Sequence, residues 1–192
     1  MLSNPYLDFF NSLPSSCRRH PGTPLDASEM LSPDWLQFKA AIAAHFAWSV
    51  PTDDAISTIG RFTRRVMEIG AGSGYWAWLL QQSGIPVRAF DASPPAFVWH
   101  AVERGDESEV SKHRSHSLLL SWPPWGSPMA AKSLANYKGK MIFFIGEWGR
   151  GCADPEFFSA LNDGYDIAAT VDLPQWYMRD DRLFVFARRR GY

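Results

Sequence analysis

Three glycines spaced two residues apart follow a short apolar run near residue 70, and this stretch constrains the fold more than any other. The run Val66–Ile69 has the length of a buried strand. Gly70, Gly72 and Gly74 form a turn in which the missing Cβ atoms let the backbone approach a ligand closely. Apolar residues then recur at helical spacing up to Gly84, which predicts a helix with a left-handed C-cap. The stretch therefore predicts a strand, a glycine turn and a helix in succession.

A second strand, Val87–Phe90, follows and places Asp91 at its carboxyl end. Strand, glycine turn, helix, strand and acid make up the nucleotide-binding half of a doubly wound α/β fold, in which the acid accepts hydrogen bonds from ribose hydroxyls. A dinucleotide-binding turn needs a small residue at position 75, so that the helix packs closely on the strand, and this chain has Tyr75 there. The bulky ring argues against a nicotinamide dinucleotide as the ligand.

The sequence from Glu68 to Gly74 resembles motif I of the class I S-adenosylmethionine-dependent methyltransferases, in which an acid stands two residues before a G-x-G-x-G turn. The resemblance implies S-adenosylmethionine as the cofactor. It also implies that Gly70, Gly72 and Gly74 pass under the methionine and ribose portions of the cofactor. By the same resemblance, Glu68 helps to place the methionine ammonium group and Asp91 binds the ribose. The alternative is an α/β protein in which the glycine turn arose by chance.

The third strand is predicted at 98–103, ending at Gly105 and Asp106. The connection before it is tight, because parallel strands normally need about a dozen residues between them. The methyltransferase family often carries an acid at this point that bonds the adenine amino group, so the resemblance implies that role for Asp106. A loop acid in a turn is the alternative. His113 and His116 lack a third ligand for a metal ion, and we expect no metal site.

Three leucines at 118–120 predict a buried fourth strand beside the first, at the switch point of the sheet. The sequence Ser-Trp-Pro-Pro-Trp follows and resembles the [Asp/Asn/Ser]-Pro-Pro-[Tyr/Trp] motif of amino methyltransferases. In that motif a polar side chain and a proline carbonyl hold the amine while a ring stacks on it, which implies substrate contacts for Pro123 and Trp125. Trp122 departs from the motif because it occupies the polar slot, with Ser121 one residue early. We interpret Trp122 and Trp125 as a cage for a planar or cationic substrate, with packing as the alternative.

The remaining apolar segments predict three more strands, at 141–145, 167–171 and 183–187. The first of these ends in a loop that carries Glu147, a candidate for binding a substrate amine or removing its proton. A surface loop charge is the alternative. Seven strands with helices between them predict a doubly wound, mostly parallel α/β sheet. The resemblance implies that the last strand lies antiparallel between strands five and six.

Residues 1–50 are expected to form a lead segment and a cap helix, and residues 51–192 a Rossmann-like methyltransferase domain, within one globular unit. Ser32-Pro33-Asp34 has the order of an N-cap, a first-turn proline and a first-turn acid. By resemblance, helices before the first strand cover the cofactor. The alternative is that their rings only pack on the sheet. The rings in question are those of Trp35, Phe38, Phe46 and Trp48.

Composition limits the partners. The 192 residues carry a net charge of −1, so no general positive field favours nucleic acid. No apolar run approaches the ~20 residues of a spanning helix, and we expect no membrane segment. Cys17 and Cys152 stand in no metal spacing, which indicates thiols in a reducing compartment and a cytoplasmic location. Nothing in the sequence indicates an oligomeric state.

These features predict an S-adenosylmethionine-dependent methyltransferase that acts on a small-molecule or amine-type acceptor held in an aromatic pocket. Two alternatives stay open: a methyltransferase of nucleic-acid adenines or tRNA bases, and a non-catalytic adaptor with the methyltransferase fold. Base methylation is less favoured because Trp122 replaces the polar side chain that would accept the target N–H.

Overall fold

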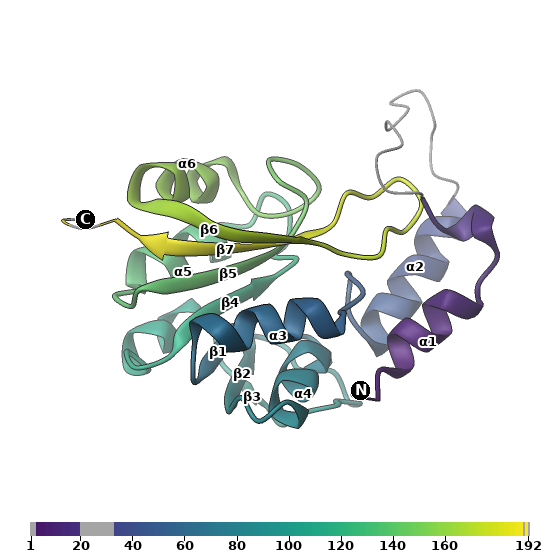
Figure 1. Ribbon diagram of the computed structural model, residues 1–192, viewed down its shortest axis with the longest axis horizontal. Coiled ribbons are helices and arrows are strands. Elements are labelled where there is room, and N and C mark those ends of the chain that lie inside the picture. Colours follow the sequence, from purple (N-terminus) through teal and green to yellow (C-terminus); the bar gives the residue numbers. More distant parts are fainter. Residues whose placement is uncertain (1–2, 20–32, 190, 192) are drawn as a thin grey trace.

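The computed structural model describes residues 3–19, 33–189 and 191, and these residues form one mixed sheet of seven strands in the order β3-β2-β1-β4-β5-β7-β6 (Figure 1). Strand β7 runs antiparallel to both of its neighbours, and the other strands are parallel to one another. The predicted doubly wound sheet, with its last strand inserted between strands five and six, is confirmed. The strands are β1 (Val66–Ile69), β2 (Val87–Asp91), β3 (Val102–Arg104), β4 (Ser117–Ser121), β5 (Met141–Gly146), β6 (Tyr165–Asp172) and β7 (Arg182–Arg188).

Helices cover both faces of the sheet. Figure 1 shows α3 in front of the sheet, α5 and α6 behind it, and α1 and α2 together beyond one end. The predicted N-cap of α2, Ser32, lies outside the described residues. The helices are α1 (Pro5–Ser12), α2 (Pro33–His45), α3 (Asp53–Phe62), α4 (Tyr75–Gln82), α5 (Met129–Asn136) and α6 (Pro155–Gly164), with short 3-10 helices η1 (Ser15–Cys17) and η2 (Glu107–Lys112).

The three leucines of β4 are buried on both sides of the sheet, as a strand with covered faces requires. Leu119 belongs to the core that α3 and α4 complete. Leu118 and Leu120 point the other way, into the core that α5 and α6 complete. Because successive side chains of a strand alternate between faces, an unbroken apolar run was needed here rather than an alternating one.

The third strand is shorter and later than predicted, since β3 is Val102–Arg104 and not 98–103. The Trp99 backbone N–H donates to the Ser73 carbonyl at 2.8 Å, so this residue is bonded to the glycine turn and not to β2. Consecutive prolines at 94 and 95 have no N–H groups with which to form a ladder. An irregular segment therefore makes the connection between β2 and β3.

The N-terminal helix α1 is tied to α4 through one buried tyrosine. The hydroxyl oxygen of Tyr75 accepts the Tyr6 backbone N–H at 3.0 Å, and the hydroxyl donates to Asn4 Oδ1 at 2.8 Å. The Tyr6 ring stacks on Phe46 with ring centroids 4.7 Å apart. Tyr75 thus anchors the N-terminal segment. A dinucleotide-binding chain carries a small residue at this sequence position, which could not form these contacts.

Replacing Tyr75 with Phe should lower the free energy of unfolding by about 1–3 kcal/mol, because the buried Tyr6 N–H and Asn4 Oδ1 would each lose a partner. Denaturant unfolding of the variant measures the loss. A double-mutant cycle with Asn4→Ala should give a coupling energy of at least about 0.5 kcal/mol. Simple additivity of the two substitutions would contradict this anchoring role.

Candidate functional site

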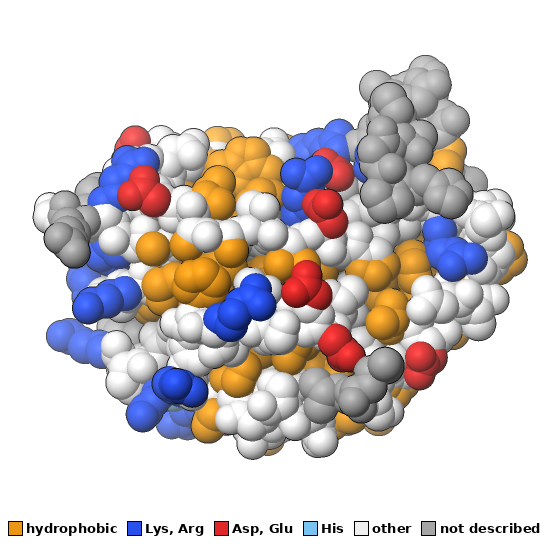
Figure 2. All heavy atoms as spheres, in the orientation of Figure 1, with side chains coloured by type: hydrophobic (Ala, Val, Ile, Leu, Met, Phe, Trp, Pro, Cys, Tyr) orange, Lys and Arg blue, Asp and Glu red, His pale blue; other side chains and the backbone are white. Residues whose placement is uncertain are grey.

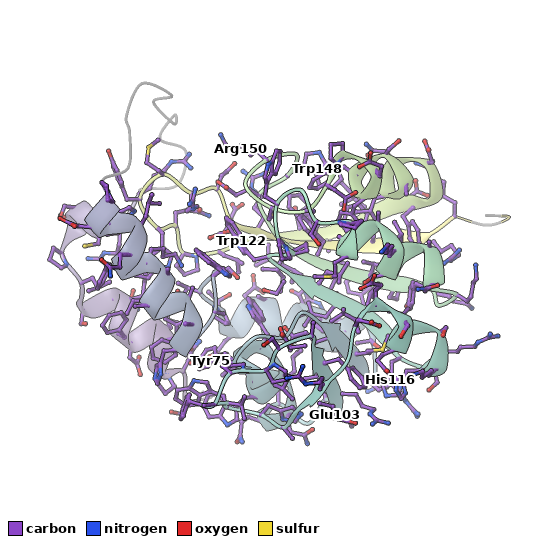
Figure 3. All side chains as sticks on the ribbon, turned by 180° about the vertical axis from the view of Figure 1, so that it is seen from behind. Tyr75, Glu103, His116, Trp122, Trp148 and Arg150 are labelled. Carbon is purple, nitrogen blue, oxygen red and sulfur yellow. The ribbon has the colours of Figure 1, made fainter. Side chains whose placement is uncertain are left out.

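A cavity of about 570 Å³ lies at the carboxyl ends of β1, β2 and β4. It is lined by the glycine turn, by the end of α2 with the segment 46–48, and by the segments after β2 and β4. Ligands of open α/β sheets bind at such a switch point, and small-molecule sites span ~300–1,000 Å³. In Figure 3, Trp122 and Tyr75 lie in the region between the cap helices and the sheet. The place and the size both fit a site for a small ligand.

The glycine turn contributes two of its three glycines to the cavity. Gly70 and Gly72 line it, and Gly74 does not. Gly72 has a φ of +54°, and a Cβ there would meet nothing within 4 Å. A Cβ on Gly74 would instead come within 2.9 Å of Val102 Cγ2. Gly74 is therefore needed for packing of the turn against β3, and the implied contact of Gly74 with a cofactor finds no support in its placement.

Asp91 ends β2 with its carboxylate at the cavity. Its Oδ2 accepts the Gly72 backbone N–H at 2.9 Å, and its Oδ1 accepts the Ser93 N–H at 2.8 Å. A carboxylate oxygen has capacity for a second hydrogen bond. Asp91 can therefore hold the turn and still accept hydroxyl donors from a ligand.

Glu68 is a buried acid at the cavity wall, with 1% of its surface exposed. Burial raises the pKa of its carboxyl group to about 8, against the smaller opposing effect of a hydrogen bond from the Ala77 backbone. Its Oε2 has no hydrogen-bond partner among the described residues. A buried acceptor without a donor costs free energy, so the site is suited to a ligand that brings a donor or a positive charge.

Asp106 lies at the rim of the cavity and also caps η2. Its Oδ1 accepts the Ser108 backbone N–H at 2.9 Å, and hydrogen bonds with Ser108 hold the pKa of the carboxyl group below its usual value. The residue is exposed. Its contact with an adenine amino group stays a prediction.

Trp122 lines the cavity together with Trp48, which comes from the segment after α2. The two rings stack with centroids 5.7 Å apart and an angle of 27° between their planes. The Trp122 indole N–H donates to Asp181 Oδ1 at 2.6 Å, which fixes the ring from the side of the β6–β7 connection. Phe46 also lines the cavity, and Trp35 and Phe38 do not. The structure thus pairs Trp122 with Trp48 rather than with Trp125.

The structure does not bring Trp125 or the Pro123 carbonyl to the cavity. The Trp125 side chain is 63% exposed and is not part of the lining. The Pro123 carbonyl already accepts the Ala153 backbone N–H at 2.8 Å, and the Gly126 N–H donates to the Ala153 carbonyl at 3.3 Å. These hydrogen bonds turn the chain away from the sheet after the first proline, so that Pro124 is the proline at the cavity.

Glu147 is buried but does not line the cavity. Its Oε1 accepts the Asp180 backbone N–H at 3.0 Å, and its carboxylate lies 3.8 Å from Arg179 and 3.9 Å from Arg150. Burial raises the pKa of the carboxyl group, and the nearby Arg179 opposes the rise. Figure 3 shows Arg150 and Trp148 away from Trp122, on the loop after β5. Glu147 therefore joins this loop to the β6–β7 connection.

A buried lysine, Lys39, contacts Trp48, and a buried aspartate, Asp181, contacts Trp122. Lys39 Nζ donates to the Trp48 carbonyl and, at 3.4 Å, to the Tyr6 hydroxyl. Burial lowers the pKa of Lys39 and raises that of Asp181, and the attraction between the two charges opposes both shifts. The one local sign of these contacts in the sequence was a lysine within the apolar stretch of α2. Lys39 Nζ also stands 4.7 Å from the centroid of the Trp176 ring, and this contact links α2 to the β6–β7 connection.

The described residues form neither a metal site nor a membrane span. No group of three or more His, Cys, Asp or Glu side chains there could hold a metal ion. Of the helices formed by those residues, none combines the length and apolar character needed to cross a membrane.

No protein-family model matches the sequence, and no curated protein matches it. Solved structures do match. A 1,6-didemethyltoxoflavin-N1-methyltransferase from Burkholderia thailandensis has a TM-score of 0.55 at 14% identity, over 86% of this chain and 94% of that chain. A magnesium protoporphyrin IX methyltransferase from Synechocystis has a TM-score of 0.53 at 11% identity, over 85% of this chain and 87% of that chain. The chain has the class I methyltransferase fold.

A protein of the NADB-Rossmann superfamily from Streptococcus agalactiae also matches, with a TM-score of 0.50 at 10% identity over 76% of this chain and 72% of that chain. The fold that the Glu68–Gly74 motif predicts, that of the class I methyltransferases, is thus confirmed. At these identities the matches show the methyltransferase fold alone.

Replacing Glu68 with Gln should stabilise the protein increasingly as pH rises from about 5 to 8. An unfolded Glu loses its proton near pH 4.3 and the folded one near pH 8, so the unfolded state binds fewer protons in this range and stability falls with pH. A Gln side chain does not titrate, so the Glu68→Gln variant does not lose stability in this way. The free energy of unfolding of the variant exceeds that of the parent protein by little near pH 4.5 and by at most about 5 kcal/mol above pH 8.

Denaturant unfolding at several pH values measures the difference, with Glu103→Gln as the matched control. Glu103 is exposed and, among the described residues, forms an ion pair with Arg88 alone, so its variant should keep the pH slope of the parent protein. Parallel pH profiles for Glu68→Gln and the parent protein would contradict the burial of an unpartnered carboxyl group at position 68.

Proposed function

We propose that this protein is an S-adenosylmethionine-dependent methyltransferase that acts on a small-molecule or amine-type acceptor held in the aromatic part of the cavity. The observation that carries the proposal is the buried, unpartnered Oε2 of Glu68, which shares one cavity with Asp91 and the backbone of Gly72. A ligand with an ammonium group at one end and ribose hydroxyls in its middle would satisfy both acids. The two methyltransferases of similar fold were crystallised with S-adenosylmethionine or S-adenosylhomocysteine, which agrees with this choice.

The residues that would hold the cofactor follow from their places along the cavity. Glu68 would receive the methionine ammonium group, and Asp91 the ribose hydroxyls. The open space above Gly72 leaves room for the ligand to pass close to the backbone. Asp106, at the rim next to the segment after β2, would bond the adenine amino group.

Bound S-adenosylmethionine supplies an electrophilic methyl group on a sulfonium centre. The work of the chain is to hold the acceptor lone pair in line with the bond that breaks, and to keep water out. Trp48 and Trp122 form the apolar wall at the end of β4 that would do both. No carboxylate or imidazole among the described residues lines this part of the cavity, so the acceptor must present a lone pair without help from a base at that wall.

Calorimetric titration with S-adenosylhomocysteine tests the cofactor part of the proposal. The parent protein should bind it, and Asp91→Ala should weaken binding by at least about 10-fold, because hydrogen bonds to a charged group contribute about 1.5–3 kcal/mol. Asp172→Ala is the control, since Asp172 is an exposed aspartate paired with Arg182 at 3.1 Å. Unchanged affinity in a folded Asp91→Ala variant would refute the cofactor assignment.

A labelled methyl donor separates the proposal from its two alternatives. Small amines and heterocycles should take up label, whereas RNA and DNA should not. Uptake by nucleic acid, with binding that weakens steeply as salt rises, would favour a base methyltransferase. Cofactor binding without uptake by any acceptor would favour the adaptor.

A further inference from the structure

We infer that the part of the cavity away from Glu68 and Asp91 selects an uncharged, flat aromatic or heteroaromatic acceptor, and that Trp48 determines this selection. The inference deepens the proposed function and rests on it, because the acceptor site is defined as the space that the cofactor leaves open. It narrows the acceptor from amines in general to ring systems without a positive charge.

Charge divides the cavity into two parts. The acids that line it are Glu68, Asp91, Asp106 and Glu107, and all of them belong to segments at the ends of β1, β2 and β3. The part formed by α2, the segment 46–48 and the segments after β4 has no charged side chain in its described lining. Burying a cation without a counter-charge is costly, so this part disfavours an ammonium group.

Both tryptophan rings already lie next to a basic side chain of the protein, and the Arg179 guanidinium is always charged. Arg179 Cζ stands over the Trp122 ring, 5.4 Å from its centroid. Lys39 Nζ stands over the Trp48 ring at 5.5 Å. The electron-rich face of an aromatic ring attracts a cation, but a second cation would be repelled by the first. The pair therefore offers its surface to uncharged rings better than to cationic ones.

The two rings stack on each other and do not form a cage. Their centroids are 5.7 Å apart, which is the separation of two rings in contact and leaves no space for a third ring between them. The Trp122 indole N–H is engaged by Asp181, so this ring presents carbon surface to the cavity. An acceptor must therefore contact the stacked pair from the cavity side, and a flat, rigid ring system can touch both rings at once.

The α2 side chains that line this part of the cavity are small. Ala40, Ala43 and Ala44 recur at helical spacing on α2, and all three line the cavity. Their methyl groups leave room for a ring and offer no hydrogen bonds. Ser121, at the end of β4, also lines the cavity, and its hydroxyl forms no side-chain hydrogen bond within the described part of the chain. That hydroxyl is available to orient one polar atom of the ring.

Two bicyclic probes of nearly equal shape test the inference: quinoline, which is uncharged near neutral pH, and N-methylquinolinium, which carries a fixed positive charge. Their affinities are measured by calorimetry and ligand-observed NMR with the protein saturated in S-adenosylhomocysteine. Quinoline should bind at least about 10-fold more tightly than N-methylquinolinium. Trp48→Ala should weaken quinoline binding by at least about 10-fold while the affinity for S-adenosylhomocysteine stays unchanged.

Two more variants distinguish a change in the acceptor site from a defect in folding. Ala44→Leu places extra bulk on an exposed position of α2 at the cavity and should also weaken quinoline binding. Phe97→Ala removes an aromatic ring that is 51% exposed and outside the cavity lining, and it should change neither affinity. Each variant is compared with the parent protein by thermal unfolding.

Three results would overturn the inference while leaving the cofactor assignment intact: equal or tighter binding of N-methylquinolinium, no binding of either probe, or unchanged quinoline affinity in Trp48→Ala. A parent protein that fails to bind S-adenosylhomocysteine would instead refute the proposed function. The two failures are therefore distinguishable in one set of titrations.

Discussion

The hydrogen bond from the Gly72 backbone N–H to the Asp91 carboxylate holds the part of the protein on which the site depends. It joins the turn after β1 to the end of β2 at 2.9 Å, beyond the last paired residues of the two strands. The Gly70 N–H donates to the Phe90 carbonyl at 2.8 Å and supports the same junction. Because the turn leads directly into α4, its geometry also determines where Tyr75 lies, and Tyr75 in turn anchors the N-terminal helix.

The cap over the cavity is positioned by this turn as well. The Ser73 hydroxyl donates to the Phe46 carbonyl, and the Trp99 indole N–H donates to the His45 carbonyl at 2.8 Å. Trp99 is itself bonded to the turn through its backbone. The segment that carries Trp48 is therefore placed relative to the cofactor side of the cavity by short-range contacts with the turn, and relative to Trp122 by the stacking of the two rings.

The resemblance to methyltransferases supplied the role of Glu68 and the antiparallel last strand, and the cofactor contacts of both acids stay predictions. Local sequence rules predicted most of the other strands, the glycine turn and the place of Asp91 at the end of β2, because these depend on residues close together in the chain. They could not predict the pairing of Trp48 with Trp122, since this contact joins residues far apart in the chain and depends on how the cap lies. A motif analogy predicted Trp125 at the cavity. The chain turns away after Pro123 instead, because backbone hydrogen bonds to the loop after β5 determine its path.

A crystal structure of the protein with S-adenosylhomocysteine tests the central claim most directly. The account predicts the ligand in the cavity, with its ribose hydroxyls within hydrogen-bond distance of the Asp91 carboxylate, about 2.5–3.0 Å, and its ammonium group against Glu68 Oε2. It also predicts that the wall formed by Trp48 and Trp122 stays free for the acceptor. A ligand bound elsewhere, or one in the cavity that contacts neither acid, would contradict it.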